Sequence, residues 1–151
     1  MIKALIAALL TTLLIAQPIQ AKTYEWWTEE DINLMTAIVA AEARGECFDG
    51  MVAVANVIIN RLKDGRWGNT IADVVFSPNQ FARPFRYEQS RNDCERANWM
   101  RCKDAVLAAL GGERVVSENV LFFQRQKRDY WFGARHYLTI GAHNFFAVEG
   151  D

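Results

Sequence analysis

Hydrophobic residues recur along the chain with a spacing that is typical of helices. Between Ile32 and Ala43 they return every three or four positions, which predicts a helix over residues 29–44. Thr28 provides an N-cap ahead of an acidic first turn, and Gly45 stands where a left-handed C-cap residue is common.

The segment over residues 49–63 is apolar on nearly every side. A helix with this pattern is expected at the buried centre of a small domain. Asn56 and Asn60 lie one turn apart within it. We expect both to be hydrogen-bonded core residues that brace a site, because buried amides need partners.

The remaining pattern predicts a short helix, a long loop, another long helix and two short strands rich in aromatic and branched residues. Their predicted ranges are 70–76 for the short helix, 81–97 for the loop, 98–110 for the long helix, and 119–124 and 143–148 for the strands. The sequence therefore predicts a single helix-rich α+β domain with a small C-terminal β element. A length of 151 residues with 51% hydrophobic and 23% charged residues fits one packed domain.

The first 21 residues have the pattern of a secretory signal. Lys3 precedes an apolar run of 13 residues from Ala4 to Ala16, which is short for a transmembrane helix, and Ala21 is a small residue at the expected cleavage site. An uncleaved signal anchor is the alternative. We expect cleavage, a catalytic domain over residues 22–151, and a secreted or periplasmic protein without stable membrane insertion.

Export makes the cysteines candidates for a disulfide. Cys94 and Cys102 are the favoured pair provided that Cys94 lies in a loop, since eight residues along one helix would separate them by about 12 Å. Cys47 is then the odd thiol. A pairing of Cys47 with either of the others stays open.

Glu42 is the candidate catalytic residue. It borders the apolar stripe of the first predicted helix and lies in its last turn, where the helix dipole disfavours an ionised carboxylate. A carboxyl group in such a place is suited to general acid catalysis. The alternative is a structural pairing with Arg44 or another arginine.

The pattern Ala41-Glu42-Ala43-Arg44-Gly45-Glu46 and several later segments resemble the SleB/CwlJ-type cell-wall hydrolases, the catalytic domains of spore-cortex-lytic enzymes and their relatives. The resemblance covers nearly all of the chain after the predicted signal. The segments that carry it are 31–61, 69–71, 75–78 with 80–81, 105–107, 120–123 and 140–146.

This resemblance implies a lysozyme-related helical fold and activity on the MurNAc–GlcNAc backbone of peptidoglycan glycan strands. It also implies a lytic transglycosylase in which Glu42 is the single acid/base, since the sugar's own 6-hydroxyl replaces water as the nucleophile. The chain departs from the family in lacking a peptidoglycan-binding repeat. Substrate-binding residues are expected at Arg44, Glu46, Gln80, Phe81, Tyr137, His143 and Phe145.

Three other functions compete with this interpretation. Glu46 could be a second carboxylate in a hydrolytic muramidase, although we prefer a role in orienting Arg44 or holding a loop. A non-catalytic wall-binding or inhibitor protein could keep the same fold. Cys47 with His136 or His143 could form a cysteine amidase, for which no local signature is present.

The expected partners follow from the charge balance and motifs. A net charge of −1 argues against a nucleic-acid binder. The histidines and acidic residues lack the spacing of a metal site, so we expect no metal. We also expect no cofactor and a monomer. The aromatic pairs at Trp26-Trp27 and residues 130–132 are either sugar-stacking platforms or packing residues.

Overall fold

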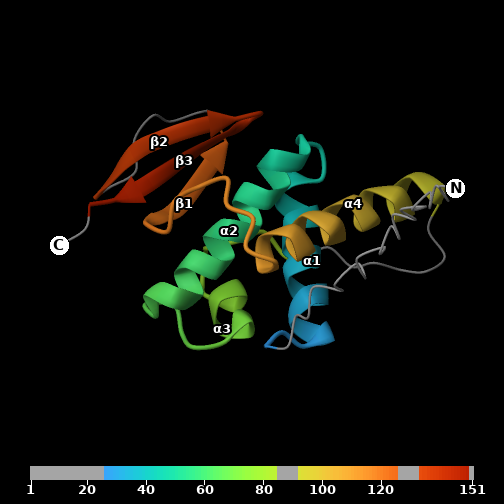
Figure 1. Ribbon diagram of the computed structural model, residues 1–151, viewed down its shortest axis with the longest axis horizontal. Helices are drawn as coiled ribbons and strands as arrows, with labels where there is room; N and C mark the ends of the chain where they lie inside the picture. Colours follow the sequence, from blue (N-terminus) through green and yellow to red (C-terminus); the bar gives the residue numbers. More distant parts are fainter. Residues whose placement is uncertain (1–25, 85–91, 126–132, 150–151) are drawn as a thin grey trace, which may run out of the picture.

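The computed structural model describes residues 26–84, 92–125 and 133–149. The predicted signal segment and the aromatic residues 130–132 lie outside this part of the chain. Within it, helices come first and strands last, which confirms the predicted helix-rich α+β class (Figure 1). The elements are α1 (Glu29–Ala43), α2 (Phe48–Asp64), α3 (Ile71–Phe76), α4 (Asp93–Leu110), β1 (Val120–Arg125), β2 (Ala134–Ile140) and β3 (His143–Val148).

Helix α2 is the central element of the fold. Its residues from Gly50 to Arg61 are all buried, and it contacts α1, α3, α4 and β1 (Figure 1). The prediction of a buried central helix is confirmed. No helix in the described residues is both long enough and apolar enough to cross a bilayer.

Capping residues set the helix starts. The Thr28 side chain accepts a hydrogen bond from the Asp31 backbone N–H, and the Thr28 N–H donates to the Asp31 carboxylate; Thr70 forms the same capping box with Asp73. The predicted left-handed C-cap at Gly45 is wrong. Arg44 ends α1 in right-handed geometry (φ −59°), because the Glu46 N–H donates to Ala43 O in a turn that needs no left-handed residue.

The small sheet is antiparallel with strand order β1-β3-β2. Strands β1 and β3 were predicted, whereas β2 was not. Strand β2 is an outer strand with no buried residue, and residues 135–137 are exposed in succession, so its sequence lacks the apolar alternation that predicts a strand. A register shift between His136 and Leu138 adds further irregularity to its pairing with β3.

Helix α4 begins at Asp93, five residues before the predicted start, so the predicted 81–97 loop is too long. Residues 85–91 of that loop lie outside the described residues. Cys94 and Cys102 therefore share one helix, and both are free thiols, as is Cys47. The predicted Cys94–Cys102 disulfide is wrong, because the helical rise places eight residues about 12 Å apart and a disulfide needs Cα atoms within about 7 Å.

Candidate active site

Glu42 lies in the last turn of α1 and is half-buried. Its Oε1 accepts a hydrogen bond of 2.5 Å from the backbone N–H of Ala82, which follows α3 by six residues. This contact joins two segments that are 40 residues apart in the sequence. Within the described residues this contact engages Oε1, and the backbone donor holds the carboxyl group in one orientation.

Arg61 lies next to this contact, in the last turn of α2, and only 3% of its surface is exposed. Its Nε donates to Leu121 O at 2.7 Å, and its guanidinium carbon lies 4.7 Å from the centre of the Phe81 ring. Burial lowers the pKa of Arg61 from its ordinary value to about 10, and the charge of Glu42 opposes that shift. Arg61 is thus charged at neutral pH and electrostatically coupled to Glu42.

Glu46 contacts the turn between β2 and β3. Its Oε2 accepts a hydrogen bond of 3.0 Å from the Ala142 N–H, and its Oε1 lies 3.5 Å from His143 Nδ1. Gly141 has φ +54°, and a Cβ built there would lie 1.7 Å from Glu46 Oε2. Glu46 therefore joins the α1–α2 turn to the tip of the β2–β3 hairpin.

His143 is 2% exposed and couples to both carboxylates. Burial lowers its pKa, while Glu46 and, more weakly, Glu42 act in the opposite direction. The desolvation effect is the larger, so burial favours the neutral imidazole. The ring packs against Phe123, with centroids 5.5 Å apart and an angle of 74° between the planes.

Aromatic rings form a layer beside these polar groups. Phe123 of β1 lies between Phe81 and Phe145, with centroid distances of 6.1 Å and 5.9 Å. Phe145 is fully buried and Phe81 is partly exposed. Phe145 and His143 thus have almost no surface to offer a ligand, so they support the site from within the fold rather than contacting a substrate.

The other predicted site residues are more dispersed. Gln80 precedes Phe81 and donates from its side chain to Pro78 O at 3.3 Å. Tyr137 is 44% exposed at the register shift of β2. Arg44 follows Glu42 by two residues, about 200° around the helix axis, where its Nη1 donates to Ala40 O at 3.4 Å and its charge acts on Cys102 of α4.

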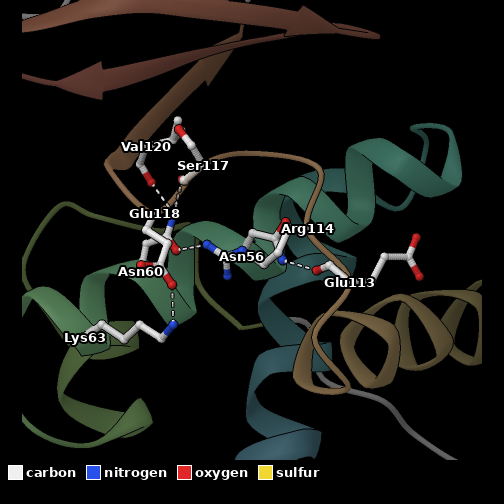
Figure 2. Close-up of polar contacts among 8 residues, drawn as sticks. All are labelled: Asn56, Asn60, Lys63, Glu113, Arg114, Ser117, Glu118 and Val120. Carbon is white, nitrogen blue, oxygen red and sulfur yellow. Dashed lines mark hydrogen bonds and ion pairs between the residues drawn. The ribbon is translucent and has the colours of Figure 1, made fainter.

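Asn56 and Asn60 are satisfied core residues, as predicted, and Figure 2 shows how they hold the segment before β1. Asn56 donates to Glu113 O at 2.9 Å and accepts from the Val115 N–H at 2.8 Å. Asn60 donates to Ser117 O and Val120 O, and accepts from the Arg114 side chain. This network fixes the entry into β1, which carries Leu121 and Phe123.

No group of three or more His, Cys, Asp or Glu side chains in the described part of the chain could hold a metal ion. The alternative of a cysteine amidase, with Cys47 beside a histidine, finds no support in the described residues, since His143 lies beside Glu46 and His136 beside Thr139.

Comparison with known proteins decides the family. Residues 45–146 match the family described as Cell Wall Hydrolase. The chain belongs to this family. The matched span contains Glu46, Arg61 and His143 and begins three residues after Glu42. The resemblance drawn from the sequence motifs is confirmed.

The named relatives of this chain are spore cortex-lytic enzymes and a cell wall hydrolase. The chain is 38% identical over 135 residues to the cell wall hydrolase CwlJ of Bacillus subtilis, covering 82% of this chain and 89% of that protein. It is 44% identical over 121 residues to the spore cortex-lytic enzyme of Halalkalibacterium halodurans, covering 79% of this chain and 35% of that enzyme. The chain spans less than half the length of the spore cortex-lytic enzymes it matches.

Solved structures confirm the fold of this chain. The catalytic domain of the Bacillus cereus SleB protein superimposes with a TM-score of 0.63 at 26% identity, over 86% of this chain and 99% of that domain. The catalytic domain of the germination-specific lytic transglycosylase SleB from Bacillus anthracis gives a TM-score of 0.60 at 25% identity, over 80% and 97%.

Sequence reasoning missed two participants in the candidate site. Ala82 acts through its backbone N–H, which leaves no side-chain signature. Arg61 could have been noticed as a charged residue at the end of an otherwise apolar helix face. A charged side chain there is seldom buried without a specific reason.

Proposed function

We propose that this chain cleaves the glycan backbone of peptidoglycan as a lytic transglycosylase, with Glu42 as the single acid and base. The names of its relatives, a cell wall hydrolase, spore cortex-lytic enzymes and a lytic transglycosylase, support the substrate class. The hydrogen bond from Ala82 to Glu42 is the observation that carries the proposal for the residue.

That hydrogen bond bears directly on proton transfer. An N–H donor to Oε1 leaves Oε2 as the oxygen that holds the acidic proton. Oε2 gives this proton to the glycosidic oxygen as the bond to the anomeric carbon breaks. The resulting carboxylate then takes the proton of the 6-hydroxyl as that oxygen attacks the same carbon, so the product ends in 1,6-anhydromuramic acid.

The contacts of Glu46 favour this mechanism over hydrolysis. A hydrolytic muramidase needs a second carboxylate that activates water or attacks the sugar. The two carboxyl oxygens of Glu46 face the Ala142 N–H and His143, and its side chain is 14% exposed. We therefore assign Glu46 to holding the β2–β3 turn, with hydrolysis by Glu42 and Glu46 as the alternative.

Gln80, Phe81 and Tyr137 are the proposed sugar-contacting residues, because each retains exposed surface. An aromatic ring face binds a sugar through dispersion and apolar contact, whereas an amide can hydrogen-bond its hydroxyls. The proposal includes export after removal of residues 1–21, which would bring the protein to its substrate, and action as a monomer.

The test is the change Glu42→Gln, which keeps the side-chain volume and removes the acidic proton. We expect lysis of purified sacculi, followed as turbidity loss, to fall by about 10²–10⁴-fold. Glu30→Gln is the matched control on the same helix, where an exposed carboxylate lies in the first turn. Lysis by folded Glu42→Gln at the rate of the control would refute the assignment.

A further inference from the structure

Arg61 is placed unusually for a structural arginine. Its side chain is packed against three rings, with the guanidinium carbon 4.7 Å from the Phe81 centre, 4.9 Å from Trp67 and 5.6 Å from Phe122. Nε is used by Leu121 O, but Nη1 is buried without a hydrogen-bond partner in the described part of the chain. Tying α2 to β1 needs only one donor, so the buried charge calls for another explanation.

A short series of contacts connects this charge to the candidate catalytic residue. The guanidinium lies over Phe81, and Phe81 is followed by Ala82, whose N–H donates to Glu42 Oε1. The position of that N–H therefore depends on how firmly the Phe81 ring is held. The aromatic surroundings also keep water from screening the interaction between the two charges.

We infer that Arg61 is a positioning residue for Glu42: it holds the Phe81–Ala82 segment against the carboxyl group and supplies a fixed positive charge that stabilises the carboxylate formed by proton transfer. The inference rests on the proposed function and deepens it. Arg61 gives up no proton in either step, and the proton moves only between Glu42 and the sugar oxygens.

Other charged groups near Glu42 differ from Arg61 in kind. His143 of β3 couples to Glu42, and burial favours its neutral form. Glu46 of the α1–α2 turn carries the opposite charge and faces His143, and Arg125 of β1 also acts on that imidazole. Among the described residues, Arg61 of α2 is thus the buried cation whose charge interacts with Glu42.

The test compares Arg61→Met with Arg61→Lys in the full protein, measuring kcat and KM on soluble glycan strands across pH. Arg61→Met is expected to lower kcat about 10- to 100-fold with little change in KM. It should also move the alkaline limb of the rate profile to higher pH, because a carboxyl group without a nearby cation keeps its proton longer. Arg61→Lys should regain part of kcat and keep the wild-type limb.

Arg66→Met is the matched control. Arg66 also lies over Trp67, at 5.1 Å, but it is half-exposed and pairs with Asp64. Its replacement should leave both kcat and the alkaline limb at their wild-type values. A shift of the limb in this variant equal to that in Arg61→Met would overturn the inference, since removal of any nearby surface charge would then have the same effect.

Phe81→Ala decides the matter if Arg61→Met fails to fold. Loss of the ring admits water to the guanidinium, so the limb should move in the same direction by a smaller amount. The inference is overturned if the alkaline limb of the rate profile does not move in the folded variants. It is also overturned if Arg61→Lys and Arg61→Met lose kcat equally. Activity of Glu42→Gln would instead refute the proposed function itself, which separates the two failures.

Discussion

The Glu46 carboxylate occupies the space that a side chain on Gly141 would need. A Cβ at Gly141 would lie 1.7 Å from Glu46 Oε2, and the neighbouring Ala142 N–H donates to that same oxygen. A side chain at residue 141 would force the Glu46 carboxylate to move and to give up its hydrogen bond with the Ala142 N–H. The left-handed φ of +54° adds a second reason for glycine.

Gly141→Ala should therefore destabilise the protein by about 2 kcal/mol, because backbone strain adds to the loss of the Ala142–Glu46 hydrogen bond when the Glu46 side chain moves away. Gly133→Ala is the matched control, because Gly133 also has a positive φ but nothing within 4 Å of the added Cβ. It should cost about 1 kcal/mol. Urea unfolding measures both changes, and equal costs would contradict the close approach of Glu46.

In a Glu46→Ala background, the extra cost of Gly141→Ala should disappear, leaving only the backbone strain that Gly133→Ala also shows. This double-mutant cycle isolates the collision from the φ effect.

Asn56 should be important for stability, because its amide satisfies two backbone groups of the segment before β1. Asn56→Leu keeps the volume but leaves Glu113 O and the Val115 N–H without that partner, at a cost of about 3 kcal/mol in the free energy of unfolding. Asn33→Leu, at an exposed position of α1, should change stability by less than about 0.5 kcal/mol. A denaturation midpoint unaltered in Asn56→Leu would contradict the bracing role.

The thiols should react according to their burial. Burial raises the pKa of Cys102 to about 11 and Cys102 is fully enclosed, 4.0 Å from Met51 Sδ, so it should react only after unfolding. Cys47 and Cys94 are exposed and should be labelled in the native protein without reductant. Mass spectrometry should find two labels before denaturation and three after it, whereas a single label throughout would indicate a disulfide.

The burial of His143 should make stability fall on acidification. Its folded-state pKa lies below the ordinary value of 6.5, so the unfolded chain binds the proton first as the pH drops below about 6.5. The stability contributed by the neutral imidazole is therefore present above this value and is lost towards the lower folded pKa. His143→Phe, which keeps a ring, should flatten the dependence of the urea midpoint as the pH falls below about 6.5, whereas an equally steep dependence would contradict this burial effect.

The helical part of the fold was accessible from sequence because its signals are local. The apolar period from Ile32 to Ala43 and the caps at Thr28 and Thr70 depend on neighbours within one or two turns. The start of α4 has a local signal too, because Asn92 is a typical N-cap residue and its side chain accepts from the Glu95 N–H. The irregular apolar pattern after Asn92 concealed the helix.

The candidate site was less accessible because its contacts are long-range. Glu42 could be singled out by its place on α1 and by the surrounding motif, yet its hydrogen-bond donor is a backbone group 40 residues away. Glu46 has its partners 96 residues further on, at the tip of a hairpin whose strand β2 lacked an apolar pattern. Such contacts depend on packing of the whole domain, which the spacing of residues along the chain does not encode.

The most direct test of the account is the chemical end of the released muropeptides. Purified sacculi digested with the wild-type protein should yield fragments that end in 1,6-anhydromuramic acid, because Glu42 alone transfers the protons and the sugar's 6-hydroxyl is the nucleophile. Mass spectrometry separates these from hydrolysis products, which are heavier by one water. Dominant anhydro ends would support the single-carboxylate mechanism, and dominant reducing ends would contradict it and assign water activation to a second group such as Glu46.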